Sequence, residues 1–192
     1  MQHDPFLAGG ERISTLSLDQ FQAAGGDQAM TVAELLDLAG GRVGLHADLK
    51  KGGDEAATLD LLLGGSGLDR LVVTTGLDAS VRRLKELCPE LAVGLSLGRS
   101  TRGLPRWEAT RVRMGELFPG PRIEACRPDF LSVNDRLARA TLLRYGAAHE
   151  LPVWVWTVNE ESRMRALLRD RRVAALITDR PDRALAIRGA SR

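Results

Sequence analysis

Two side chains in one short apolar run have the types and spacing of a phosphate site. The run Val43–Lys50 reads Val-Gly-Leu-His-Ala-Asp-Leu-Lys, so apolar and polar residues alternate along it. Because the side chains of a β-strand alternate between its two faces, His46, Asp48 and Lys50 share one face. A carboxylate is a hard oxygen ligand for Ca²⁺ or Mg²⁺, and an ammonium group can stabilise phosphoryl oxygens. The same spacing also fits a structural Asp48–Lys50 ion pair at a strand end.

A histidine and two tryptophans are weaker candidates. His3 opens a His-Asp-Pro segment, and a histidine so near the start of a chain is usually solvated. Trp154 and Trp156 share one face of the run Pro152–Val158. We expect Trp154 to pack inside the fold and Trp156 to wall a ligand pocket. Asp179 is expected to cap the helix that follows it.

These candidates lie on an alternation of short β-rich runs with helical patterns. Such an alternation predicts an α/β fold with a parallel sheet, right-handed crossovers and function at the carboxyl ends of the strands. The expected strands are Val43–Lys50, Leu71–Thr75, Leu91–Leu97, Phe130–Val133, Pro152–Val158 and Val173–Thr178. The expected helices are Val32–Ala39, Ala56–Leu63, Ser80–Leu87, Arg106–Leu117, Leu137–His149 and Glu160–Arg169, with a short piece near Ser17–Ala24.

Composition narrows the class of protein. The 192 residues are 44% hydrophobic, which predicts a folded chain, and we expect one domain over residues 1–192. The net charge of only +2 argues against a nucleic-acid partner. No run is apolar and long enough for a membrane span, no signal peptide is visible and the two cysteines form no CxxC pattern, so we expect a cytoplasmic protein. One segment is rich in arginine and is expected to be a solvated face: Arg99, Arg102, Arg106, Arg111 and Arg113.

Taken in order, several segments resemble the glycerophosphodiester phosphodiesterase family. The resemblance implies a (β/α)8 barrel of the TIM type, as in phospholipase C-like phosphodiesterases, of which this chain carries about six parallel strands. These match strands three to eight, so we expect a chain that is incomplete at its N-terminus. The matching segments are His3–Pro5, Leu16–Phe21, Met30–Leu36, Asp48–Lys50, Trp156–Asn159 and Ile177–Pro181.

The resemblance also implies a reaction and its residues. Members of the family hydrolyse small glycerophosphodiesters to glycerol phosphate and an alcohol such as choline, in glycerophospholipid catabolism, with a divalent Ca or Mg ion as cofactor. His3 matches the catalytic acid/base histidine and Lys50 the phosphate-binding lysine of the family. Asp48 matches a metal ligand, and Trp156 matches the aromatic residue of the substrate pocket.

The chain departs from the family pattern in ways that keep other functions open. The His-Arg-Gly and Glu-x-Asp motifs of the family's first two strands do not occur in it, so we expect weak metal binding and negligible hydrolysis by these 192 residues. One alternative is a non-catalytic protein of the same fold that binds a phosphate ligand or a partner. Another is an open doubly wound sheet with an unrelated binding function. Unpaired sheet edges also predict self-association.

Overall fold

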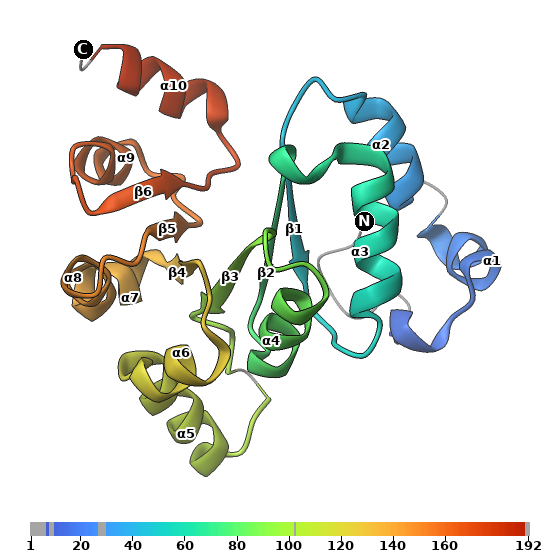
Figure 1. Ribbon diagram of the computed structural model, residues 1–192, viewed down its shortest axis with the longest axis horizontal. Helices are drawn as coiled ribbons and strands as arrows, with labels where there is room; N and C mark the ends of the chain where they lie inside the picture. The colour runs from blue at the N-terminus through green and yellow to red at the C-terminus, as the bar shows by residue number, and fades with distance from the viewer. Residues whose placement is uncertain (1–6, 8–9, 27–29, 102, 191–192) are drawn as a thin grey trace.

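One curled sheet of six parallel strands forms the centre of the molecule. The computed structural model describes residues 7, 10–26, 30–101 and 103–190. The strands are hydrogen-bonded in chain order, which confirms the α/β fold and excludes a doubly wound order (Figure 1). They are β1 (Leu45–Leu49), β2 (Leu71–Thr75), β3 (Ala92–Leu97), β4 (Phe130–Asn134), β5 (Val153–Trp156) and β6 (Val173–Leu176).

Helices connect the strands and cover the convex face of the sheet (Figure 1). Among the described residues, no helix has the length and apolar content to cross a membrane. The α-helices are α1 (Leu18–Phe21), α2 (Val32–Ala39), α3 (Glu55–Ser66), α4 (Asp78–Leu87), α5 (Arg106–Leu117), α6 (Gly120–Cys126), α7 (Asp135–Leu137), α8 (Leu143–Ala148), α9 (Glu161–Leu168) and α10 (Pro181–Gly189).

The hydrophobic core lies between the sheet and these helices. Val73, Val93 and Val133 are fully buried in it, in one cluster with Leu84 of α4 and Met164 of α9. These strand residues alternate with residues of the opposite face, as the period of two requires. The core therefore fixes the polar and aromatic side chains of the strands on the other, concave face.

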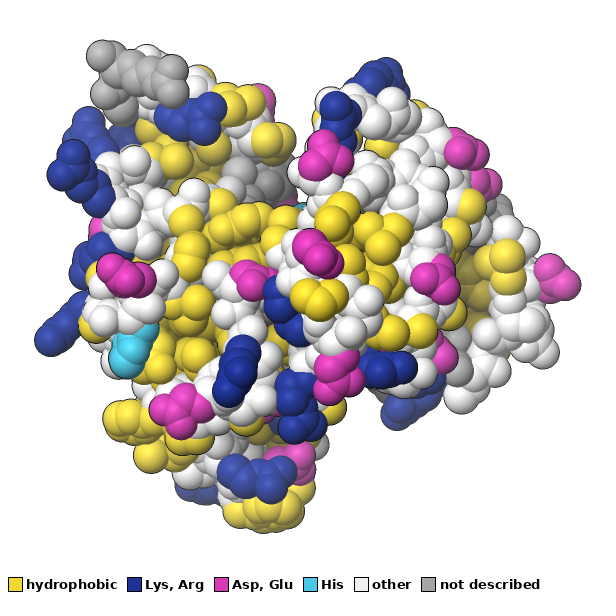
Figure 2. All heavy atoms as spheres, viewed as in Figure 1, with side chains coloured by type: hydrophobic (Ala, Val, Ile, Leu, Met, Phe, Trp, Pro, Cys, Tyr) yellow, Lys and Arg dark blue, Asp and Glu magenta, His cyan; other side chains and the backbone are white. Residues whose placement is uncertain are grey.

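The sheet curls into a half-barrel. The ring of His46 on β1 touches the ring of Trp154 on β5, with centroids 5.5 Å apart, although the two strands are not neighbours in the sheet. In the described sheet β1 pairs with β2 alone and β6 with β5 alone, so the barrel is open. Figure 2 shows hydrophobic side chains at the surface across the middle of the same view.

Local sequence signals account for some of the element boundaries. Thr31 and Glu34 form the capping box that starts α2, because each side chain accepts a hydrogen bond from the other residue's backbone. Helix α6 was not expected from the sequence, since Pro119, Gly120 and Pro121 indicate a turn. Pro121 lies in the first turn of α6, where a missing N–H is tolerated.

Candidate functional site

The concave face holds a chain of hydrogen bonds that starts at the expected phosphate site. Lys50 Nζ donates to Asp48 Oδ2 at 2.5 Å, and the Thr74 hydroxyl donates to Asp48 Oδ1 at 3.2 Å. Register explains the second bond, because Asp48 and Thr74 are directly paired residues of β1 and β2. His46 Nε2 lies 2.9 Å from Thr74 Oγ1. Since the Thr74 proton points to Asp48, His46 must donate, so its Nε2 carries hydrogen.

The outer end of this chain is open to solvent. The Lys50 side chain is 67% exposed and that of Asp48 36% exposed. An ion pair so exposed adds little to the stability of the fold. An ammonium group has three donors, and Asp48 takes one from Lys50. The Lys50 head group therefore remains available to a ligand that reaches the carboxyl end of β1.

Aromatic rings fill the concave face below this end. Trp154 stacks on Phe130 with centroids 4.4 Å apart, and its ring also meets the edge of His46. The packing expected for Trp154 is thus confirmed. Partial burial lowers the pKa of His46, while the nearby Asp48 carboxylate raises it and Lys50 lowers it. The imidazole is therefore held more strongly in its neutral form than a free histidine would be.

Two further residues expected from the sequence to belong to the site are Trp156 and His3. Trp156, the last residue of β5, is half-buried and lies two residues beyond Trp154 on the same face. Asp48 likewise lies two residues beyond His46 on its own strand. Because the rings of His46 and Trp154 are in contact, Asp48 and Trp156 both lie nearer than that contact to the carboxyl ends of their strands. His3 falls outside the described residues.

The described residues do not fit a divalent metal ion. Both carboxylate oxygens of Asp48 are already engaged, one by Lys50 and one by Thr74. No group of three or more His, Cys, Asp or Glu side chains that could hold a metal occurs in the part of the chain that the structure describes. Calcium and magnesium need several oxygen ligands. Asp48 alone therefore makes no metal centre.

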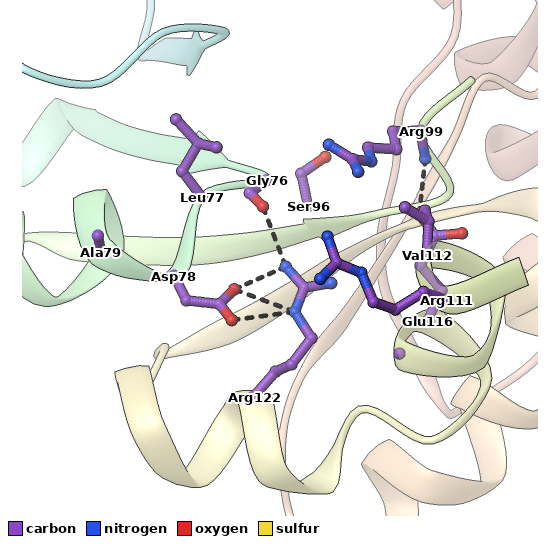
Figure 3. A pocket seen from close by; sticks show the side chains of 11 residues that line it. Gly76, Leu77, Asp78, Ala79, Ser96, Arg99, Arg111, Val112, Glu116 and Arg122 are labelled. Atoms are coloured by element: carbon purple, nitrogen blue, oxygen red, sulfur yellow. Dashed lines mark hydrogen bonds and ion pairs between the residues drawn. The ribbon is translucent and has the colours of Figure 1, made fainter. Parts of the chain in front are cut away.

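A separate cavity of about 480 Å³ opens at the carboxyl ends of β2 and β3 (Figure 3). It is bounded by the start of α4 and by α5 and α6, and it includes Ser96 from the concave face. Arg99 and Arg111 line it and are exposed, which agrees with the solvated face expected for this arginine-rich segment. Their convergence depends on how α5 is held to the loop after β3, which the sequence pattern did not reveal.

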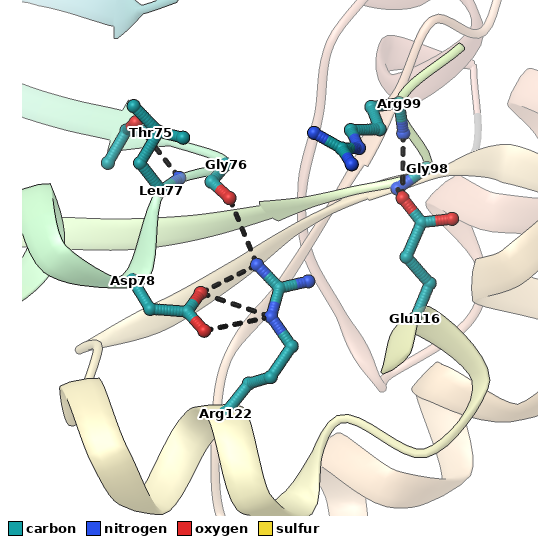
Figure 4. Close-up of polar contacts among 8 residues, drawn as sticks. All are labelled: Thr75, Gly76, Leu77, Asp78, Gly98, Arg99, Glu116 and Arg122. Atoms are coloured by element: carbon teal, nitrogen blue, oxygen red, sulfur yellow. Dashed lines mark hydrogen bonds and ion pairs between the residues drawn. The ribbon is translucent and has the colours of Figure 1, made fainter. Parts of the chain in front are cut away.

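Two carboxylates fix the walls of this cavity (Figure 4). Asp78 accepts from Arg122 Nη2 at 2.6 Å and from Nε at 3.0 Å, and Arg122 Nη2 also donates to the carbonyl oxygen of Gly76 at 3.0 Å. Glu116 is 2% exposed, and its Oε1 accepts from the backbone N–H groups of Gly98 and Arg99, each at 2.9 Å. The loop after β2 is thus tied to α6, and the loop after β3 to α5.

The chain resembles known proteins in its three-dimensional structure, whereas its sequence matches none of them closely. No family model matches the chain, and no curated protein matches it in sequence. A glycerophosphodiester phosphodiesterase from Parabacteroides distasonis superposes with a TM-score of 0.75 at 14% identity, over 99% of this chain and 77% of that one. This chain has the glycerophosphodiester phosphodiesterase fold. The open barrel and the family resemblance are confirmed at the level of fold.

Two further structures with this fold agree. A phosphodiesterase from Oleispira antarctica, solved with the product sn-glycerol-3-phosphate, gives a TM-score of 0.72 at 19% identity, over 97% of this chain and 77% of that one. A glycerophosphodiester phosphodiesterase from Agrobacterium tumefaciens gives a TM-score of 0.67 at 15% identity, over 96% of this chain and 79% of that one. At such identities the glycerophosphodiester phosphodiesterase fold is shared, and the chemistry of each residue must be argued from its own contacts.

The loops at the carboxyl ends of β5 and β6 correct one expectation. Asp179 does not cap α10, whose N-cap is Arg180 with no side-chain capping bond. Asp179 instead accepts from Asn159 Nδ2 at 2.7 Å, and its own N–H donates to Asn159 Oδ1 at 3.0 Å. The pair holds the loop after Trp156 to the loop after β6.

Proposed function

We propose that the concave face binds a glycerophosphodiester and that the reaction class of this site is phosphoric diester hydrolysis. One observation carries the proposal. The exposed Lys50 ammonium is held by Asp48 at the carboxyl end of β1, within the glycerophosphodiester phosphodiesterase fold. The solved Oleispira antarctica protein with sn-glycerol-3-phosphate supports this ligand class.

Lys50 is the phosphate-binding residue in this proposal. Its free N–H donors take one or two phosphoryl oxygens, with charge on both partners strengthening the hydrogen bonds. Asp48 acts through Lys50, since its carboxylate fixes the direction of the ammonium group. Thr74 and His46 in turn fix Asp48 from below. The residues from His46 to Lys50 thus present one oriented cation to the ligand.

Hydrolysis joins a water oxygen to phosphorus and breaks the bond from phosphorus to the alcohol oxygen. The leaving alkoxide takes a proton as it departs, and the attacking water loses one. We assign the proton transfer to His3, as the family resemblance implies, and we place the alcohol group against Trp156. Lys50 stabilises the charge that develops on the phosphoryl oxygens. No step assigned to the described residues passes through a metal ion.

A second candidate is binding of the same ligand without hydrolysis. It is favoured by the finding that the described residues include no group of three metal-ligating side chains. In the family the divalent ion neutralises the phosphodiester, and without it a large share of transition-state stabilisation is lost. This second candidate predicts negligible choline release with Ca²⁺ or Mg²⁺ and measurable affinity for glycerol phosphate.

Both candidates are tested by two measurements on the same preparations. Choline release from glycerophosphocholine reports hydrolysis, and calorimetric titration with sn-glycerol-3-phosphate reports binding. Lys50→Ala should weaken binding about tenfold, since a hydrogen bond to a charged group contributes about 1.5–3 kcal/mol. Lys51→Ala, which removes the adjacent lysine, is the matched control and should leave binding unchanged.

The outcomes separate the two candidates. Choline release that disappears in His3→Ala and in Asp48→Ala establishes the hydrolase. Binding that depends on Lys50 without choline release establishes the binding protein. If sn-glycerol-3-phosphate binds no better to the parent chain than to Lys50→Ala, the concave face is not a phosphate site and both candidates are wrong.

A further inference from the structure

The cavity at the ends of β2 and β3 carries more positive charge than its own carboxylates neutralise. Three arginines line it: Arg99 from the loop after β3, Arg111 from α5 and Arg122 from α6. Figure 3 shows their guanidinium groups pointing to a common space beside Ser96. Guanidinium groups repel one another, so their convergence in a concave space produces a local positive potential.

The two acidic residues of the cavity are already committed. Asp78 is held by two nitrogens of Arg122, and both oxygens of Glu116 are used. Glu116 Oε1 accepts two backbone N–H groups, and Oε2 accepts from Arg113 Nη1 at 2.9 Å. Neither carboxylate is therefore available to neutralise a further cation.

Arg99 and Arg111 supply the excess charge. In the described part of the chain neither guanidinium makes an ion pair with a carboxylate, and Arg111 lies 5.7 Å from the ring centre of Trp107. Arg122 adds a donor, because its Nε and Nη2 face Asp78 and Gly76 while Nη1 remains. Together with the hydroxyl of Ser96, these groups offer several N–H and O–H donors. Both carboxylates that line the cavity are already engaged.

We propose that this cavity is a second anion site, distinct from Lys50, that binds a small phosphate monoester. Two uncompensated guanidinium groups match the double negative charge of a phosphate monoester, and their planar forks match its oxygens. The volume of about 480 Å³ leaves room for an organic group beyond the phosphate, against Leu77 and Val112. The site does not depend on the proposed hydrolysis.

The cavity lies at the carboxyl edge of the sheet, beside the concave face. Gly76 and Ser96, which line it, lie at the same carboxyl edge of the sheet as Thr74, the hydrogen-bond partner of Asp48. A bound anion would therefore sit beside the concave face and not on the remote side of the sheet. Arg99 and Arg111 are both exposed, so a ligand can enter from solvent.

The test uses the full chain carrying Lys50→Ala, which removes phosphate binding by the concave face. Inorganic phosphate is titrated by calorimetry at low salt into this chain and into the chain that also carries Arg99→Ala and Arg111→Ala. We expect binding in the first and at least tenfold weaker binding in the second. The matched control carries Arg106→Ala and Arg144→Ala, which remove the same net charge outside the cavity and should leave the affinity within twofold.

Further measurements check that the variants fold and which compound supplies the phosphate monoester. A second pair of variants, Arg99→Gln and Arg111→Gln, keeps a polar side chain but removes the charge, and it must lose binding as well. Urea unfolding verifies that all chains fold. Soluble sn-glycerol-3-phosphate and vesicles containing phosphatidate both present a phosphate monoester. Binding of either through Arg99 and Arg111 supports the site and identifies the source of its ligand.

Two results would overturn the proposal. One is that the Lys50→Ala chain binds no phosphate monoester from either source, which leaves the proposed function of Lys50 untouched. The other is that binding does not depend specifically on Arg99 and Arg111. Binding then either survives their loss or falls equally in the Arg106 and Arg144 control. The last result would mean that net charge alone attracts phosphate.

Discussion

At the scale of single residues, the hydrogen bond from His46 to Thr74 determines where the imidazole carries its proton. Thr74 has one hydroxyl hydrogen and gives it to Asp48, so His46 donates from Nε2. The neutral ring satisfies this bond completely. Protonation would add a charge to a ring that is partly buried against Trp154, which is why burial lowers the pKa of His46.

This lowered pKa predicts a dependence of stability on pH. The unfolded chain takes up a proton near the ordinary value of 6.5, whereas the folded chain does so only at lower pH. Between these values the unfolded state binds more protons, so the free energy of unfolding falls as pH drops below 6.5. His46→Gln should reduce that fall, as measured by urea unfolding between pH 7.5 and about pH 5.

The matched control for this prediction is His149→Gln. His149 lies at the end of α8, where its ring stacks on that of Tyr145 with centres 4.2 Å apart. It is not part of the concave face. In this variant the fall in stability that His46 causes should remain. A chain lacking His46 that loses stability with acid as steeply as the parent would contradict the assignment.

At the scale of elements, a glycine in β3 makes room for an aromatic ring of the neighbouring strand β4. A Cβ on Gly94 would lie 2.4 Å from Cε2 of Phe130, and Phe130 is itself stacked on Trp154. The ring cannot move away without breaking that stack. The aromatic filling of the concave face therefore requires glycine at this position of the strand.

Gly94→Ala should accordingly destabilise the fold by about 1–3 kcal/mol, the usual cost of overpacking. Urea unfolding monitored by tryptophan fluorescence measures the change. Gly64→Ala is the matched control, because a Cβ at this position of helix α3 meets nothing within 4 Å. It should stabilise by about 0.5–1 kcal/mol, since glycine is a poor helix former. Equal effects of the two variants would contradict the packing argument.

The elements also show why some features were predictable from the sequence and others were not. Asp48 and Lys50 share a face because their spacing of two is local, and the capping box of Thr31 is equally local. The bond from Thr74 to Asp48 needs the register of β1 on β2, which no pattern within one strand contains. Arg99 and Arg111 line one cavity only because α5 is held to the loop after β3, so the cavity was not foreseen.

At the scale of the whole molecule, the open half-barrel leaves two strands with one neighbour each in the described sheet. The outer edges of β1 and β6 present backbone groups that another strand can pair with. Val43, just before β1, is 57% exposed, and Ala174 of β6 is exposed as well. We propose that these edges pair between copies of the chain.

This proposal predicts self-association of the 192-residue chain that increases with concentration. Val43→Lys combined with Ala174→Lys should shift the population to monomers in sedimentation velocity, because charge at a strand edge opposes pairing. Leu185→Lys, at a 58% exposed position of α10, adds charge away from both edges and should have no effect. A parent chain that stays monomeric over the whole concentration range would refute edge pairing.

The chain order of the strands has a consequence for biosynthesis. Each strand from β2 to β6 pairs with the strand made just before it. A growing chain can therefore extend the sheet one unit at a time as it leaves the ribosome, with one helical connection to close at each step. The contact of His46 with Trp154 is different, since it joins the first strand to the fifth. The sheet can thus lengthen during translation, while its curvature becomes fixed only after β5 has emerged.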